Sequence, residues 1–183
     1  MRKFLTCCVF AFLLSSAGIA QQTKREITRP ANSAEDNRPN SNAVPDVYAI
    51  NGQFQRVVIL RFKYKADLLA GLEQMVKQQK ITNAVILAAM GSVRNYQVHA
   101  VSNRTFPSSD VFVKDPTDPA DIIGMSGYIL KGRVHAHITL SKGDRAFGGH
   151  LEPGTNVFTF AVVTLGVFND DADFSRLDDQ TYR

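Results

Sequence analysis

GRVHAHITLSKGDRAFGGHL, Gly132–Leu151, predicts a β-hairpin that carries three of the four histidines in the chain. The flanking pieces RVHAHITLS and RAFGGHL have the β-branched and aromatic residues typical of strands. Gly143 and Asp144, between them, supply the turn chemistry of a short hairpin connection. The segment therefore predicts antiparallel pairing, and it raises the question of why imidazoles gather there.

The register of this hairpin decides which side chains meet. With Gly143-Asp144 as a two-residue turn, His137 lies opposite His150, and His135 lies opposite Glu152. Side chains two residues apart on a strand share one face. Opposed Cβ atoms lie roughly 5 Å apart, so all four side chains would gather on one face. A three-residue turn, or a bulge at the glycine pair before the last histidine, would change this register.

Imidazoles at these spacings predict a metal site formed by His135, His137 and His150. Neutral imidazole suits zinc or another divalent transition metal rather than magnesium or calcium. Three histidine ligands leave a fourth position open, as in catalytic zinc sites. Glu152 is the nearest carboxylate to serve as a fourth ligand, as a hydrogen-bond partner that orients a ligating histidine, or as a base. The alternative is that the histidines form hydrogen bonds or a subunit contact. We expect His99, in NYQVHAV, to lie outside the ligand set.

The remaining pattern predicts an α+β fold with a mainly antiparallel sheet and one principal helix. The helix is expected within 66–80, where leucine, methionine and valine recur at helical spacing. We expect the run 81–93 to be a buried strand ending in a turn at Gly91-Ser92. The segment 102–121 is predicted to be a loop with solvated aspartates. Further strands are predicted at 56–64, 95–101, 122–130 and 156–168. The last is apolar on both faces, so we expect one face to cover the core and the other, with outward residues such as Val163, to meet a neighbouring subunit.

The N-terminal residues 1–20 match a secretory signal peptide, with a basic start, an apolar run and small residues before Gln21. A membrane anchor is the rival interpretation, but the apolar run is short of the about 20 residues needed to span a bilayer. We expect cleavage after Ala20 and a secreted or periplasmic protein with no membrane contact after signal removal. Residues 21–46 are polar and proline-punctuated, which predicts a disordered linker.

Signal removal would change the chemistry of the chain. Cys7 and Cys8 are its two cysteines, so the remaining protein would have no disulfide and no thiolate ligand. The charge is +4 for the full chain and would fall by the two residues Arg2 and Lys3. Such a weak charge gives no reason to expect specific nucleic-acid binding.

Several stretches together resemble the plant and prokaryote conserved (PPC) domain family, over about Arg56–Val167. The most specific is the histidine-x-histidine strand followed by GGHL; MSGYIL and PGTNVFTFAVVTL support it. The resemblance implies a homotrimer. The sequence pattern itself predicts a domain at 47–168 and an acidic C-terminal tail at 169–183. The resemblance also implies zinc binding by His135, His137 and His150, as in some prokaryotic members. Plant members carry DNA-binding hooks and a partner loop, Gly-Arg-Phe-Glu-Ile-Leu; this chain lacks the hook, and reads ADIIGM at the loop.

Three functions stay open at this point. The first is an exported, trimeric metal-binding protein, with or without metal-assisted catalysis on a small-molecule ligand. The second is a non-catalytic binding or assembly module in which the histidines pack the trimer. DNA binding ranks last. The sequence identifies neither a substrate nor a reaction.

Overall fold

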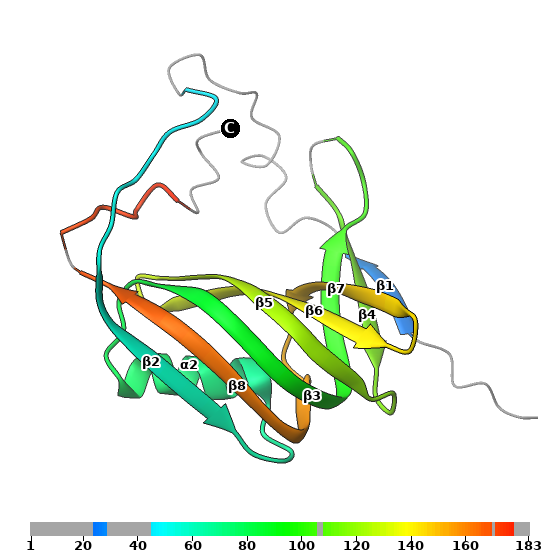
Figure 1. Cartoon of the computed structure of the whole chain (residues 1–183). Helices are drawn as coiled ribbons and strands as arrows, with labels where there is room; N and C mark the ends of the chain where they lie inside the picture. Colours follow the sequence, from blue (N-terminus) through cyan, green and yellow to red (C-terminus); the bar gives the residue numbers. More distant parts are fainter. Residues whose placement is uncertain (1–23, 29–44, 106–107, 170, 178–183) are drawn as a thin grey trace, which may run out of the picture.

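A computed structural model describes residues 24–28, 45–105, 108–169 and 171–177 of the 183-residue chain (Figure 1). The predicted signal peptide lies outside these residues, as does most of the predicted linker. Within the described part, no helix is both long and apolar enough to cross a bilayer.

The described residues form one mostly antiparallel sheet with a single short helix, in agreement with the predicted α+β class. The elements in chain order are β1 (Lys24–Thr28), β2 (Phe54–Phe62), α2 (Leu68–Gln78), β3 (Ala84–Val101), β4 (Asp110–Asp115), β5 (Ala120–Leu130), β6 (Arg133–Lys142), β7 (Arg145–Leu151) and β8 (Asn156–Phe168). All the strand pairs are antiparallel.

Strand β3 organises the sheet because it pairs with four other strands. Its first half pairs with β8 and β5, and its second half pairs with β4 and β7. The succession β3–β5–β6–β7 thus returns to β3, and β2 extends the sheet beyond β8. The site described below lies where β7 meets β3.

The turn predicted at Gly91-Ser92 is wrong, because β3 runs through it without interruption. Gly91 pairs with Ala161 of β8 and Ile122 of β5. A Cβ atom on Gly91 would lie only 2.2 Å from the carbonyl oxygen of Phe160. The glycine therefore permits close approach of a neighbouring strand. In the sequence alone, a glycine with this role cannot be distinguished from a glycine in a turn.

Helix α2 covers one face of β2, β8 and β3 (Figure 1). Asp67 caps its N-terminus by accepting a hydrogen bond from the Ala70 amide. The apolar stripe of the helix includes Leu68, Leu72 and Val76, which are buried in the core as predicted. This packing buries the core between the helix and the sheet.

The opposite face of these strands is apolar and exposed. We expected β8 to have such a face, with Val163 as an example of an outward residue. That example is wrong, because Val163 is fully buried in the core. The outward residues are instead Val57 and Ile59 of β2 and Leu87 and Met90 of β3, each close to half exposed or more.

Two predicted irregular segments contain strands. Lys24–Thr28, inside the predicted linker 21–46, forms β1 and pairs with β4. The predicted loop 102–121 contains β4 itself. Asp115 at the end of β4 is buried and accepts hydrogen bonds from the amides of Thr117 and Asp118, so it is not a solvated loop residue. The start of the predicted acidic tail also packs on the fold, through Phe174.

Candidate metal centre

The predicted hairpin register is confirmed. β6 and β7 are joined by the two-residue turn Gly143-Asp144, with His137 paired to His150. The neighbours of the β6 histidines, Ala136 and Ile138, are buried in the core, so His135 and His137 share the other face. Their rings stack with centroids 5.5 Å apart.

The fourth histidine joins this group through a pairing that the sequence did not indicate. β3 pairs with β7 so that His99 lies opposite His150. The two rings stack with centroids 4.4 Å apart. His99 was predicted to lie outside the ligand set, with a hydrogen-bonding or subunit-contact role. One feature of the sequence could have pointed to His99 as a member of the site: it is the only histidine outside the hairpin.

Glycines allow β7 to approach both of its neighbours. A Cβ atom on Gly149 would lie 2.3 Å from the carbonyl oxygen of His99, and one on Gly148 would lie 1.9 Å from that of Ile138. These distances are too short for any side chain. The glycine pair before His150 thus sets the spacing between strands on which the histidine group depends.

Glu152 is positioned by backbone contacts immediately after β7. Its amide donates to the carbonyl oxygen of Gln97 on β3. The hydroxyl of Thr155, which is fully buried, contacts the carbonyl oxygens of both Gln97 and Glu152. The loop is therefore held against β3, and the Glu152 carboxylate reaches the histidines.

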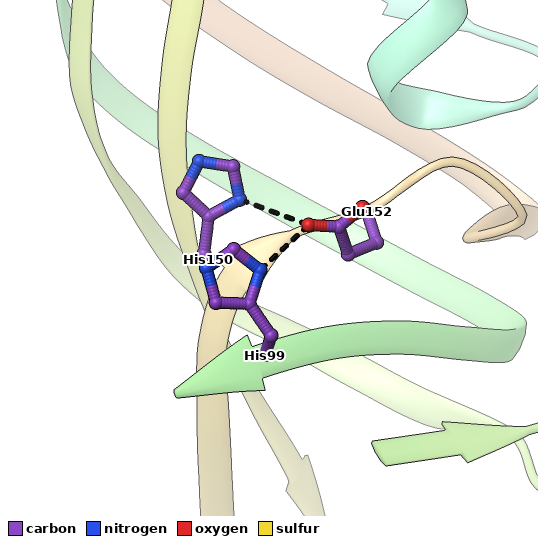
Figure 2. A group of neighbouring side chains, drawn as sticks. All are labelled: His99, His150 and Glu152. Carbon is purple, nitrogen blue, oxygen red and sulfur yellow. Dashed lines mark hydrogen bonds and ion pairs between the residues drawn. The ribbon is translucent and has the colours of Figure 1, made fainter. Parts of the chain in front are cut away.

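Three side chains converge closely enough to hold a metal ion: His99, His150 and Glu152. Their ligand atoms all lie within 4.8 Å of one another. Figure 2 shows both imidazoles directed at one carboxylate oxygen, Oε1 of Glu152. His99 Nδ1 lies 2.6 Å from this oxygen and His150 Nδ1 lies 3.4 Å from it.

His150 Nδ1 is buried and, apart from this 3.4 Å ion-pair contact with Glu152, has no hydrogen-bond partner among the described residues. A buried polar atom left unpaired costs free energy, so its presence calls for an explanation. Two imidazole nitrogens and a carboxylate oxygen form a donor set typical of zinc and related ions. The residues therefore fit a metal ion, which would give the Nδ1 atom its missing partner.

The three predicted ligands lie together, although only His150 belongs to this closest group. The ring of His150 lies 5.0 Å from that of His135 and 5.5 Å from that of His137, between centroids. All four histidines and Glu152 thus form one cluster, the histidine cluster. The ligand set His135, His137 and His150 stays a prediction beside the group that includes His99.

The surroundings of His137 and His150 lower the pKa of both imidazoles and so favour their neutral form. Burial lowers the pKa of His150 below its ordinary value, and His99 and His135 lower it further, while Glu152 opposes them. The pKa of His137 is also lowered, first by partial desolvation and then by His135 and His99, although this side chain keeps much of its solvent contact. Neutral imidazole is the form that binds metals.

We expect Gly149→Ala to disrupt the cluster and to destabilise the protein by about 1–3 kcal/mol, because β7 must move away from β3. Urea unfolding measures the loss of stability, and NMR of the histidine rings reports the spacing. Gly124→Ala is the control, since a Cβ atom there meets nothing within 4 Å. Equal stability of the two variants would contradict the role given to Gly149.

The fold and this cluster define a small α+β protein, built on an antiparallel sheet, with a group of side chains able to hold a metal ion. The chain belongs to the Plants and Prokaryotes Conserved (PCC) domain family, whose model matches residues 49–169. The resemblance to the PPC domain drawn from the sequence is thereby confirmed.

Two of the solved structures of similar fold come from archaea. A metal-containing protein from Archaeoglobus fulgidus matches with a TM-score of 0.56 and 22% identity, over 74% of this chain and 95% of that one. A plant- and prokaryote-conserved protein from Pyrococcus horikoshii matches with a TM-score of 0.54 and 18% identity, over 68% of this chain and 87% of that one. At these identities the likeness is one of fold.

The curated relatives are much longer proteins. The bifunctional protein GlmU of Synechococcus sp. strain JA-3-3Ab is 27% identical over 129 residues, which make up 70% of this chain and 20% of that protein. The GlmU protein of a second Synechococcus strain matches over 16% of its length. This chain thus spans a fifth or less of those proteins.

Proposed function

We propose that this protein binds one divalent transition-metal ion in the histidine cluster, and that zinc is the first candidate. The observation that carries the proposal is the convergence of His99, His150 and Glu152. The buried Nδ1 atom of His150, which makes no hydrogen bond with the described residues, lies among them. The lowered pKa values of His137 and His150 support it, because protons then compete less with the metal. The Archaeoglobus protein of similar fold is described as metal-containing, which adds support.

Three protein ligands would leave a coordination position open. A zinc ion held in this way can act as a Lewis acid and can lower the pKa of a bound water molecule. The residues of this chain would then hold the ion and orient it: the Thr155 contacts fix the Glu152 backbone, and β3–β7 pairing fixes the two imidazoles. The site thus suits a metal-assisted reaction on a small molecule.

Metal analysis of the protein, purified without a histidine tag, tests the proposal. After zinc loading and desalting, we expect about one equivalent of zinc per chain, since three converging ligands hold zinc strongly. Less than about a tenth of an equivalent would refute the metal site. The cluster would then be a packing feature of a non-catalytic module.

A second proposal concerns assembly. We infer a homotrimer in which the exposed apolar face of β2, β8 and β3 meets a neighbouring subunit. Large apolar patches on a protein surface mark interaction sites, and this one includes Val57, Ile59, Leu87 and Met90. The observation favours an assembly role that is compatible with metal binding.

We also propose that the protein is exported and loses residues 1–20. The motive is the basic, apolar and small-residue succession at the N-terminus. N-terminal sequencing of the protein recovered outside the cytoplasm should begin at Gln21. A stable product in the membrane fraction that still begins at Met1 would contradict export with cleavage and favour an anchor.

A further inference from the structure

A pocket of about 910 Å³ opens beside the histidine cluster. It lies between the end of α2, the segment that follows this helix, and the turn that joins β5 to β6. His135 and His150 line its inner side. Its volume is within the range of about 300–1,000 Å³ typical of small-molecule sites.

The pocket is strongly cationic. Its lining includes four basic residues, Lys77, Lys80, Lys131 and Arg133, and one acidic residue, Glu73. Their formal charges give a net value of +3, against +4 for the whole chain. A cleft lined by one sign of charge attracts ligands of the opposite sign.

Lys80 occupies a backbone position that favours glycine. The amide of Ile81 donates to the carbonyl oxygen of Val76, and the amide of Lys80 donates to that of Lys77. These two bonds form a Schellman motif, in which Lys80 takes the left-handed conformation with φ of 52°. A lysine there is less favourable than glycine, so helix termination does not explain the choice.

Lys131 occupies a second such position. Leu130 pairs with Arg133 across the two-residue turn Lys131-Gly132, whose φ angles of 51° and 75° are both positive. Turns of this type strongly favour Asn-Gly. The Lys131 amide donates to the side chain of Asn83, so this turn is tied to the segment after α2.

Residues other than glycine that adopt the left-handed backbone conformation are found most often at functional sites, where the side chain is needed. The described residues include three of them, all lysines: Lys65, Lys80 and Lys131. Two of the three line this one pocket. In two separate turns, a lysine thus occupies a backbone conformation that is unfavourable for it, and both lysines line this pocket.

We propose that this pocket binds a small organic anion, a carboxylate or a phosphate monoester. Lys77, Lys80 and Lys131 hold its acidic group, and the rest of the molecule extends toward His135 and His150. The second half rests on the proposed metal site, because it places the ligand beside the metal. The first half, anion binding by the lysines, does not require the metal.

Calorimetric titration with phenyl phosphate, benzoate and uncharged benzyl alcohol tests the proposal, on the protein as purified and after treatment with a chelator. At least one anion should bind with Kd below about 1 mM, and about tenfold or more tightly than the alcohol. The preferred anion identifies the acidic group. Equal binding of all three compounds, or no binding, would overturn the proposal.

Lys80→Gly and Lys131→Asn separate anion binding from folding. Each places a favoured residue in its turn, so the melting temperature should not fall. Each should weaken binding of the preferred anion about fivefold through loss of one charge. Lys65→Gly is the matched control: it removes the same charge from a left-handed position, with φ of 66°, outside the pocket.

The two halves of the proposal fail separately. Unchanged anion affinity in Lys80→Gly and Lys131→Asn, or an equal loss in Lys65→Gly, would overturn the pocket assignment. The zinc content of these variants should equal that of the wild type. A wild type that binds the anion but no zinc would leave the anion pocket standing and refute the metal site. If zinc loading leaves anion affinity unchanged, the placement of the ligand beside the metal is wrong.

Discussion

His150→Ala should reduce the zinc bound after loading and desalting from about one equivalent to below about a tenth, because His150 is a ligand in both candidate sets. Its imidazole lies between His99, His135 and His137 and contacts Glu152. No other side chain of the cluster is shared in this way. Elemental analysis measures the loss, and circular dichroism checks that the variant is folded.

Two further variants distinguish the ligand sets. We expect His99→Ala to lose most of the zinc, since His99 Nδ1 lies 2.6 Å from Glu152 Oε1 within the closest group. His137→Ala is the matched control and should keep the greater part. The reverse result would establish His135, His137 and His150 as the ligands and return His99 to a hydrogen-bonding role. Full zinc in His150→Ala would refute both sets.

The pH dependence of zinc retention tests the metal site independently of these variants. A lowered pKa means that His137 and His150 stay neutral below the ordinary histidine value of about 6.5, so zinc should be retained at that pH and lost as the pH falls further. In the metal-free protein, the unfolded chain binds these protons more readily than the folded one. The stabilising effect of the neutral imidazoles is therefore complete above about pH 6.5 and is lost as the pH falls through the lowered values. Half-loss of zinc well above pH 6.5 would contradict this electrostatic account.

Ile59→Asp should dissociate the assembly into single chains. Ile59 is 69% exposed in one subunit, and it lies on the apolar face with Val57 and Met90. A charge placed in a subunit interface loses its hydration without a partner, which costs several kcal/mol. Light scattering should show a trimer for the wild type and a mass of about one third for the variant.

The effect should be specific to this face. A mutation at so exposed a site changes the stability of an isolated subunit by only about 0.5 kcal/mol, so unfolding would not explain dissociation. Val101→Asp is the control, because Val101 is 67% exposed at the far end of β3, where this strand pairs with β4 instead of β8. A monomeric wild type, or equal dissociation of both variants, would remove the proposed assembly surface.

Local residue patterns specify much of this protein. The hairpin register follows from Gly143-Asp144, because a two-residue turn leaves one alignment of the flanking strands. The alternation of Ala136 and Ile138 with the histidines specifies which side chains share a face. The apolar stripe of α2 follows from helical spacing in the same way. Each of these features depends on residues close together in the chain.

Long-range pairing specifies the rest. His99 meets His150 because β3 continues through Gly91 and then pairs with β7, about fifty residues later in the chain. A glycine has the same appearance in a sequence whether it makes a turn or lets another backbone approach, so Gly91 was interpreted as a turn. Val163 was placed outward for a related reason: an apolar strand does not indicate which of its faces meets the helix. Both features depend on a strand or helix distant in sequence, and the alternation along a single strand contains no information about that partner.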